Sequence, residues 1–255
     1  MNVSLNINGF SVDAHFGAEA VNHLLLPLLR DLSEMQKRLN RRMIVLLGAP
    51  PGAGKSTLAA YLEILSRSEE GLVPVQALGL DGFHFHQSEI LSRTVLRGGL
   101  EIPMKEIKGA PESFDVGKLK NMLLTARERD VLWPFYDRRI HDVIEGAVPA
   151  TAPILLIEGN WLLLNAPEWT GLTRDFSLFI DADESLLRER LIARKVRGGL
   201  TRAEAEDYYL RSDGPNIRLC RTCRQRADLT WIMTGDGEYQ SLPKGNCHAL
   251  QSHIV

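Results

Sequence analysis

Residues 49–56 form a glycine-rich turn that ends in lysine and serine. The turn reads Ala-Pro-Pro-Gly-Ala-Gly-Lys-Ser, Thr57 follows it, and an apolar run that begins at Ile44 precedes it. Such a turn directs backbone N–H groups at anionic oxygens, and the positive end of the following helix adds to the attraction. Ala49 stands where glycine is usual, which is a change to another small residue. The sequence therefore predicts a loop that binds the phosphates of a nucleoside triphosphate.

The side chains of this loop have expected partners. Lys55 is placed to meet the outer phosphates, and the hydroxyl of Ser56 is placed to bind Mg²⁺. A chance Gly-Lys-Ser-Thr in a surface loop is the alternative, but the apolar run before the turn and the helix-prone segment 58–65 after it favour a true phosphate loop. We expect the nucleotide to be bound by Pro51, Gly52, Ala53, Gly54, Lys55, Ser56 and Thr57.

Three acidic residues directly follow short apolar runs that we predict to be strands. They are Asp81 after Val75–Leu80, Glu158 after Ile154–Ile157 and Asp181 after Phe176–Ile180. Open parallel sheets bind ligands beyond the carboxyl ends of their strands, so these positions are candidates for chemistry. A phosphoryl transfer site needs a carboxylate that orients the attacking hydroxyl, together with oxygen atoms that hold Mg²⁺.

We assign different roles to these three carboxylates. Asp81 is the candidate catalytic base, because Gly82 permits a sharp turn that aims the carboxylate at the phosphates; a helix N-cap is the alternative. Glu158 is expected beside the metal, with the hydroxyl of Ser56 as the direct ligand. For Asp181 we favour a cap of the next helix.

Two further segments offer contacts for a phosphate acceptor. His84 and His86 flank Phe85, and we favour substrate contact by one of them over a zinc site. Segment 134–141, Pro-Phe-Tyr-Asp-Arg-Arg-Ile-His, mixes aromatic and charged groups as a polar pocket does, with a solvated turn as the alternative. The expected substrate-binding residues are His84, Tyr136, Arg139, His141 and Asn160.

A cluster of basic residues marks a candidate lid. Arg188, Arg190, Arg194, Lys195 and Arg197 lie on one predicted helix, which ends at Gly198 and Gly199. Arg190 and Arg194 share a helix face. Phosphoryl transfer requires cations that arrive when a lid closes, so we expect these two arginines to act in catalysis together with Lys55 and Asp81. A charged helix surface is the alternative.

The remaining elements predict an α/β fold. Short apolar runs alternate with helical segments, which is typical of a mainly parallel sheet with helices on both faces. The clearest helices cover 115–129, with Asp115 as its cap, and 184–196. Segment 89–113 is less regular and suits a loop that covers a substrate. Leucines spaced by three and four from Leu24 to Leu32 indicate an amphipathic helix, for which core packing is favoured over a partner-binding role.

Three parts of the chain follow from this organisation. Residues 1–41 are expected to be an N-terminal extension whose helix packs on the core. Residues 42–240 are expected to be the catalytic domain, with the lid at about 186–212. Residues 241–255 are expected to be a loose tail.

Composition excludes several classes of function. The 255 residues carry a formal net charge of -2 with no basic block, so we expect no nucleic-acid partner. No stretch approaches the roughly 18 apolar residues of a membrane helix, and the start of the chain lacks the pattern of a signal sequence. We therefore expect a cytoplasmic protein without a membrane partner, whose ligand is a small molecule with a hydroxyl group. A homodimer is left open.

The three cysteines suit a reducing compartment. Cys220 and Cys223 form a CxxC pair, and Cys247 and His248 are further candidate ligands for a metal. The spacing matches no zinc pattern, so we favour the interpretation that no metal binds here.

Taken together, these motifs resemble the P-loop kinase superfamily of uridine kinase, phosphoribulokinase and the bacterial type of pantothenate kinase. The likeness runs from about Arg42 to Met233. Within that superfamily the chain looks most like a branch often labelled nucleoside or nucleotide kinase family, or fructose transport-system kinase. The matching elements are the phosphate loop, Leu80-Asp-Gly-Phe-His, Lys108-Gly-Ala-Pro-Glu-Ser-Phe-Asp115, Pro134-Phe-Tyr-Asp with His141, Ile157-Glu-Gly-Asn160, Asp213-Gly-Pro-Asn216 and the arginine-rich lid.

The resemblance implies a P-loop NTPase fold with a lid helix, Asp81 as catalytic base and Glu158 beside the magnesium site. Uridine kinase holds the ribose diol with an acidic residue at a position that is Gly109 here, whereas the segment that begins at Lys108 is similar to pantothenate kinase.

Two hypotheses follow. The leading one is an ATP- and Mg²⁺-dependent kinase of a small hydroxylated metabolite: a sugar, a pantothenate-like acid or a nucleoside. The alternative is a nucleotide-dependent regulatory ATPase that acts through a protein partner, which the N-terminal helix and the ambiguous substrate pocket suggest. A GTPase is disfavoured, because the guanine-reading motif Asn-Lys-x-Asp does not occur.

Overall fold

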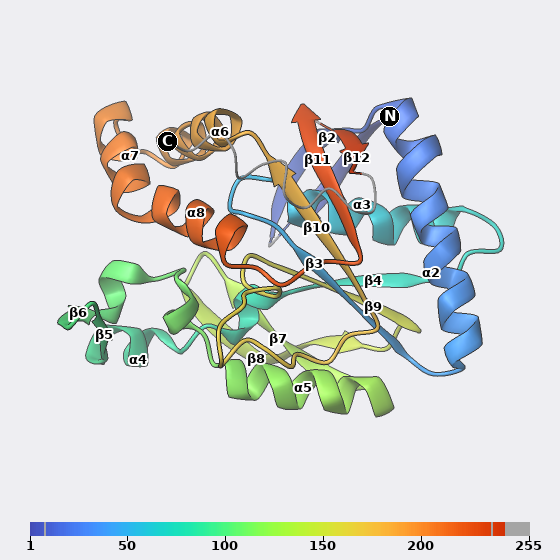
Figure 1. Ribbon diagram of the computed structural model, residues 1–255, viewed down its shortest axis with the longest axis horizontal. Helices are drawn as coiled ribbons and strands as arrows, with labels where there is room; N and C mark the ends of the chain where they lie inside the picture. Colours follow the sequence, from blue (N-terminus) through green and yellow to red (C-terminus); the bar gives the residue numbers. More distant parts are fainter. Residues whose placement is uncertain (8, 236, 243–255) are drawn as a thin grey trace.

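A six-stranded sheet forms the centre of the protein. The computed structural model describes residues 1–7, 9–235 and 237–242. The strand order is β12-β11-β10-β3-β9-β4, with β12 antiparallel at one edge and the other five strands parallel (Figure 1). The bounds are β3 Met43–Gly48, β4 Val75–Gly79, β9 Ile154–Gly159, β10 Phe176–Ala182, β11 Leu229–Gly235 and β12 Glu238–Ser241. The predicted α/β fold with a mainly parallel sheet is confirmed.

Helices cover both faces of this sheet. The helices are α1 Ala18–Ala20, α2 Leu26–Leu39, α3 Lys55–Ser68, α4 Gln87–Ser92, α5 Val116–Glu128, α6 Glu184–Arg197, α7 Arg202–Tyr208 and α8 Gly214–Thr222. Shorter helical turns are η1 Val21–Leu25, η2 Leu80–Phe83, η3 Met104–Ile107, η4 Pro111–Ser113 and η5 Tyr209–Asp213. No helix in the described part of the chain is long and apolar enough to span a membrane.

The central strand β3 shows why two layers of helices are needed. Its six residues are all buried, and their side chains alternate between the faces. Met43, Val45 and Leu47 pack in the apolar cluster that contains α2, α3 and α6, whereas Ile44 and Leu46 pack in the cluster that contains α5. A strand that is apolar on both faces is stable only when both faces are covered.

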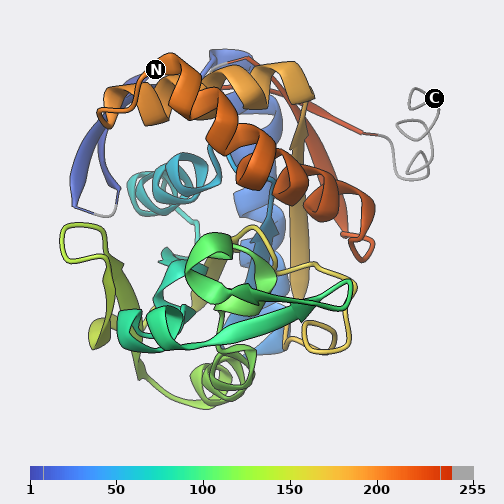
Figure 2. The same cartoon turned by 90° about the vertical axis from the view of Figure 1, so that its left-hand side faces the viewer.

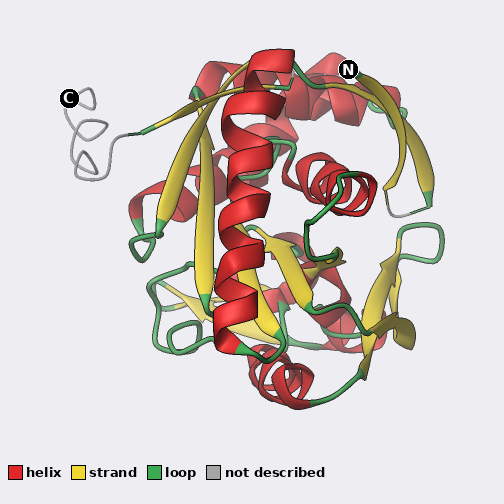
Figure 3. Ribbon diagram, turned by 90° about the vertical axis from the view of Figure 1, so that its right-hand side faces the viewer, coloured by secondary structure: helices red, strands yellow, loops and turns green. Residues whose placement is uncertain are grey.

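The N-terminal segment packs on the same core. β1 (Asn2–Ile7) and β2 (Phe10–His15) form a hairpin, and α2 then runs across the sheet (Figure 3). Leu28, Leu29 and Leu32 of α2 are buried, and Phe16 stacks on Tyr61 of α3 with ring centroids 4.1 Å apart. The amphipathic helix is therefore confirmed, while the division at residues 41 and 42 stays a prediction. Of the expected tail, residues 243–255 lie outside the described residues.

Helix α5 begins as its sequence predicts. The side chain of Asp115 is the N-cap and accepts a hydrogen bond from the N–H of Lys118 at 2.9 Å. An N-cap carboxylate satisfies one of the backbone donors that a helix leaves unpaired at its start.

The predicted cap role of Asp181 is wrong. Strand β10 pairs with β11 as far as Ala182, so the next helix starts later than expected. The N-cap is Asp183, whose side chain accepts a hydrogen bond from the N–H of Ser185 at 2.8 Å. Asp181 is instead buried in the strand and forms an ion pair with Arg221, with 2.8 Å between its Oδ1 and the Nε of Arg221.

Two hairpins were not anticipated in the chain between β4 and β9. β5 (Thr94–Arg97) and β6 (Leu100–Pro103) form one within the segment expected to be irregular. Gly98 and Gly99 make its two-residue turn, and both have positive φ, which is the conformation that tight hairpins favour. The second hairpin, β7 (Val131–Asp137) with β8 (Asp142–Ala150), contains the aromatic segment expected to contact a substrate.

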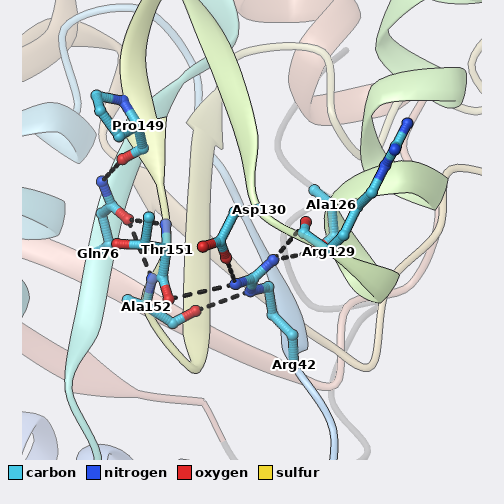
Figure 4. A network of polar contacts seen from close by, with 8 residues as sticks. All are labelled: Arg42, Gln76, Ala126, Arg129, Asp130, Pro149, Thr151 and Ala152. Atoms are coloured by element: carbon cyan, nitrogen blue, oxygen red, sulfur yellow. Dashed lines mark hydrogen bonds and ion pairs between the residues drawn. The ribbon is translucent and has the colours of Figure 1, made fainter.

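Arg42 links several segments by hydrogen bonds at the end of the sheet opposite the phosphate loop. Its guanidinium donates hydrogen bonds to the carbonyls of Ala126 at 2.8 Å, Arg129 at 2.5 Å and Ala152 at 3.0 Å, and it forms an ion pair with Asp130 (Figure 4). These contacts join the end of α5 and the connection before β9 to the start of β3. Several backbone carbonyl groups thus accept hydrogen bonds from this one side chain.

We predict that Arg42→Met lowers the free energy of unfolding by about 2–4 kcal/mol, because carbonyl groups lose their donors and Asp130 loses its partner. Urea denaturation followed by circular dichroism measures this change. Arg129→Gln is the control, since the side chain of Arg129 is exposed and its carbonyl is retained; its effect should stay within about 0.5 kcal/mol. Equal stability of Arg42→Met and the wild type would contradict this role.

Candidate active site

The loop between β3 and α3 has the backbone of a phosphate site. Gly52 and Gly54 have φ of 87° and 73°, in the left-handed region that glycine adopts without strain. Gly54 is the N-cap of α3, and no side chain caps the first turn of this helix. A bound anion can therefore take the place of a cap on the N–H groups that begin at Lys55. This loop fits the phosphates of a nucleotide.

Helix α6, which the sequence analysis assigns to a candidate lid, packs directly on this loop. A Cβ atom on Gly52 would lie 3.1 Å from Cγ of Leu191, and the positive φ would strain any other residue, so glycine favours this close packing. Arg190 Nη1 donates to the carbonyl of Gly52 at 3.1 Å. The helix and the phosphate loop are thus in contact in this structure.

Ser56 and Glu158 are joined by a hydrogen bond. The hydroxyl of Ser56 donates to Oε1 of Glu158 at 2.7 Å, and parallel pairing places Glu158 opposite Leu47 near the end of β3. Burial raises the pKa of the Glu158 carboxyl; the Lys55 ammonium opposes this shift, and the Asp81 carboxylate adds to it. A buried carboxylate next to a second carboxylate favours a cation in the space between them.

The donor set fits Mg²⁺. Magnesium prefers hard oxygen ligands, keeps several waters, and is commonly held by one or two carboxylates together with substrate phosphates. Ser56 and Glu158 supply a hydroxyl and a carboxylate beside the phosphate loop. Within the described residues no group of three or more His, Cys, Asp or Glu side chains could form a metal cage, so the phosphates would complete the site.

Asp81 lies in the turn η2 directly after β4. Its side chain is 45% exposed, and no side chain caps this turn, so the N-cap alternative for Asp81 is wrong. Gly82 is required for a different reason from the one expected: a Cβ atom there would lie 2.1 Å from the carbonyl oxygen of Pro134, because β7 passes directly against the turn. This packing leaves the carboxylate of Asp81 accessible at the edge of the sheet.

An aromatic wall adjoins Asp81. The ring centroid of His84 lies 3.9 Å from that of Phe114 and 5.3 Å from that of Tyr136. Nδ1 of His84 is 2.9 Å from the carbonyl oxygen of Asp81. Burial lowers the pKa of His84, so the imidazole is neutral near pH 7. His86 contacts other groups, with ring nitrogens 3.3 Å from each of the carboxylates of Asp142 and Glu145.

The two arginines after β7 have different environments. Arg139, the expected substrate residue, has an 80% exposed side chain whose guanidinium donates to both carboxylate oxygens of Asp137. Its neighbour Arg138 instead faces the base, with Nη2 at 3.9 Å from Oδ2 of Asp81. Sequence reasoning missed Arg138, because two adjacent arginines in a turn carry no signal that says which one points inward.

Of the other two residues predicted to contact the acceptor, His141 has an exposed side chain and Asn160 has a buried side-chain oxygen. His141 is exposed with φ of 55°, and it is its carbonyl that accepts a hydrogen bond from Lys108. Asn160 follows β9, and its Oδ1 is buried without a hydrogen-bond partner among the described residues. The structure therefore brings Asp81, His84 and Tyr136 together, while the side chains of Arg139 and His141 lie outside this group.

Arg194, the second arginine of the candidate lid, lies near the same charges. Arg194 is exposed at the surface, yet the surrounding protein lowers the pKa of its guanidinium by desolvation; Asp213 and Asp81 oppose this shift, and Arg138 adds to it. The lid continues beyond Gly198 and Gly199 into α7, and Figure 2 shows α6, α7 and α8 on one side of the molecule with α4 and the β5–β6 hairpin facing them.

The cysteines have no ligand arrangement among the described residues. Cys220 is buried, its Sγ donates to the carbonyl of Asn160 at 3.1 Å, and burial raises its pKa to about 12. Cys223 is exposed. Cys247 and His248 lie outside the described residues, so the interpretation that no metal binds here stays a prediction.

Comparison with known proteins gives relatives of similar length. The chain is 42% identical over 242 residues to the "Uncharacterized protein YggC" of Escherichia coli (strain K12), which covers 94% of this chain and 98% of that protein. It is 30% identical over 182 residues to the "Putative uridine kinase C227.14" of Schizosaccharomyces pombe, covering 68% of this chain and 74% of the relative. No family model matches the chain.

More distant relatives and a solved structure agree with these matches. Pantothenate kinase of Streptococcus thermophilus is 27% identical over 179 residues, and the alignment spans 56% of its length. The crystal structure of a "putative fructose transport system kinase" from Silicibacter sp. TM1040 has a TM-score of 0.72 and 29% identity, covering 82% of this chain and all of that one. Together with the phosphate loop, these similarities show that the chain belongs to the P-loop kinases that include the uridine kinase-like proteins and pantothenate kinase.

Proposed function

We propose that the protein uses ATP and Mg²⁺ to transfer the terminal phosphoryl group to a hydroxyl of a small metabolite. The observation that carries this proposal is the pairing of Ser56 with the half-buried Glu158 beside the accessible carboxylate of Asp81. Membership of the family supports the general activity of a nucleotide-using phosphotransferase. The nucleotide, the metal and the acceptor belong to the proposal.

The chain's own residues have distinct roles in this reaction. Asp81 orients the acceptor hydroxyl and takes its proton as the oxygen bonds to phosphorus and the bond to ADP breaks. Lys55, Arg190 and Arg194 offset the charge that develops on the transferred group. Ser56 and Glu158 would hold the metal, which when bound neutralises charge on the phosphate oxygens. Residues 51–57 hold the nucleotide in place.

The lid and the acceptor side complete the proposal. We assign lid closure to residues 186–212, which carry Arg190 and Arg194 toward the phosphates and exclude water. His84, Tyr136 and Asn160 line the acceptor side, and Arg138 replaces Arg139 as the cation beside the base. One of the two features behind the regulatory ATPase alternative, the N-terminal helix, is also explained by core packing, because Leu28, Leu29 and Leu32 of α2 are buried in the core.

We predict that Asp81→Asn lowers kcat by about 10²- to 10⁴-fold, because the amide cannot accept the hydroxyl proton. The affinity for ATP should change less than about threefold, since Asp81 is not part of the phosphate loop. ADP release and calorimetric titration of ATP measure the two quantities. The control Asp13→Asn changes an exposed carboxylate in β2 and should leave both intact. Unchanged kcat in Asp81→Asn would refute the assignment.

A second prediction concerns the pH dependence of stability in the nucleotide-free protein. Burial raises the pKa of Glu158, so the folded state holds its proton more tightly than the unfolded chain does. The contribution of the Glu158 carboxyl to the free energy of unfolding is fully present when the pH is below its ordinary pKa of 4.5. This contribution is lost as the pH rises through the raised pKa of the folded state. Glu158→Gln lacks this loss, so its stability relative to the wild type should increase as pH rises above 4.5.

Urea denaturation at a series of pH values measures this difference. Glu70→Gln is the matched control, because Glu70 is exposed and its substitution should give a difference that hardly depends on pH. A difference between Glu158→Gln and the wild type that stays constant with pH would contradict the buried, proton-retaining state of Glu158.

A further inference from the structure

The side chain of Arg138 has a single partner in the described part of the chain. It forms one ion pair, with Nη2 at 3.9 Å from Oδ2 of Asp81, and no hydrogen bond. Its neighbour Arg139, in contrast, donates to both carboxylate oxygens of Asp137. A guanidinium carries five N–H donors, so the donors of Arg138 are left to water or to a ligand.

Stability does not explain why this guanidinium stands beside the base. The side chains are nearly half exposed, at 43% for Arg138 and 45% for Asp81, and their separation of 3.9 Å is too long for a hydrogen bond. Ion pairs of this kind contribute little to the free energy of unfolding. The weak contact with Asp81 therefore leaves the guanidinium free to exchange one anion for another.

The backbone that carries Arg138 is anchored next to the base. Arg138 directly follows β7, and Nε1 of Trp133 in this strand donates to the carbonyl of Gly79 at 2.9 Å. The ring of Trp133 also lies edge-on to that of Phe83, with centroids 4.9 Å apart. Gly79 ends β4, and Phe83 belongs to the turn η2 that carries Asp81. These contacts hold β7 beside the base without any contribution from helix α6.

The charge of Arg138 reaches the phosphate side of the site. Burial raises the pKa of the Glu158 carboxyl, and Arg138 is one of the charges that oppose this shift. Desolvation lowers the pKa of Arg194, and Arg138 adds to that shift. Glu158 accepts the hydroxyl of Ser56 at 2.7 Å, next to the phosphate loop. Arg138 is thus within electrostatic range of a proposed metal ligand and of an arginine of the candidate lid.

A phosphoryl group suits this position better than a carboxylate does. The positive charges of Arg138 and Arg194 repel each other, and an anion between them relieves this repulsion. The terminal phosphate of a nucleotide carries more negative charge than a carboxylate, and its oxygens match the planar fork of a guanidinium. A nucleotide bound in the phosphate loop would therefore draw Arg138 away from Asp81.

We propose that Arg138 is a further catalytic residue, which leaves Asp81 and contacts the phosphoryl group during its transfer. The acceptor oxygen bonds to phosphorus, the bond from phosphorus to the ADP oxygen breaks, and the hydroxyl proton passes to Asp81. Arg138 exchanges no atom or proton, and it offsets the charge on the oxygens of the transferred group. Because it follows β7 rather than lying on α6, this cation is in place before a lid closes. The proposal rests on the proposed kinase function.

A transition-state analogue tests this contact without an acceptor. Aluminium fluoride bound next to MgADP imitates the transferred phosphoryl group, so the quantity measured is the gain in affinity for MgADP when aluminium fluoride is added, by calorimetric titration. Arg138→Met should lower this gain by at least about tenfold, because one guanidinium contact is lost. Arg138→Lys should lie between this variant and the wild type, since an ammonium keeps the charge without the fork.

Two controls accompany this measurement. The affinity of Arg138→Met for MgADP alone should change less than about twofold, because the proposed contact is made only with the transferred group. This result also shows that the variant is folded and that its phosphate loop is intact. Arg30→Met changes an exposed arginine of α2 and should keep the full gain.

The outcomes separate the role of Arg138 from the proposed function. A full gain in both the wild type and Arg138→Met would overturn this role and leave the kinase proposal standing; a guanidinium that binds only the acceptor would give this result. An equal loss of affinity with and without aluminium fluoride would also overturn the role, because the defect would then lie in nucleotide binding or folding. A wild-type protein without any gain would contradict the kinase proposal and the role of Arg138 with it.

Discussion

The hydrogen bond between Ser56 and Glu158 joins the first turn of α3 to strand β9 at the edge of the sheet where the candidate site lies. Ser56 is the second residue of α3, just after the phosphate loop, and Glu158 lies near the end of β9, which pairs in parallel with β3. Because the register places Glu158 opposite Leu47, the acidic group stands beside the loop where a nucleotide would carry its metal. Glu158 is also opposite Gly79, so the turn that carries Asp81 is brought to the same edge. Parallel pairing alone therefore assembles a hydroxyl and two carboxylates from distant parts of the chain.

Close backbone packing then fixes the orientation of these groups. Gly52 admits Leu191 of the lid helix, and Gly82 admits the backbone of β7. The contact at Gly82 packs the hairpin that carries Tyr136 against the turn that carries Asp81. The turn with Asp81 and the hairpin with Tyr136 thus form one packed unit. Under the proposed function, α6 would contact the nucleotide side and the β7–β8 hairpin the acceptor side.

The parts of the fold that follow from local patterns could be predicted from the sequence. The apolar run of β3 and the glycine-rich residues after it predict a buried strand followed by a phosphate-binding loop. Asp115 lies directly before a helical segment, where its side chain can accept a hydrogen bond from a backbone N–H group of the first turn. Asp181 could not be placed, because the length of β10 is set by pairing with β11 rather than by its own residues. The β5–β6 hairpin was missed because its strands are short, although Gly98 and Gly99 were a signal for its turn. The choice between Arg138 and Arg139 depends on contacts between segments that no local pattern records.

The central claim is that the loop around Lys55 holds the terminal phosphate of ATP between the metal ligands and Asp81. A crystal structure with Mg²⁺ and a non-hydrolysable ATP analogue tests it most directly. We predict that the triphosphate follows residues 51–57, that the metal contacts Ser56 on the side of Glu158, and that the terminal phosphate faces the carboxylate of Asp81. A nucleotide bound away from this loop, or a terminal phosphate on the side of the sheet opposite Asp81, would contradict the account.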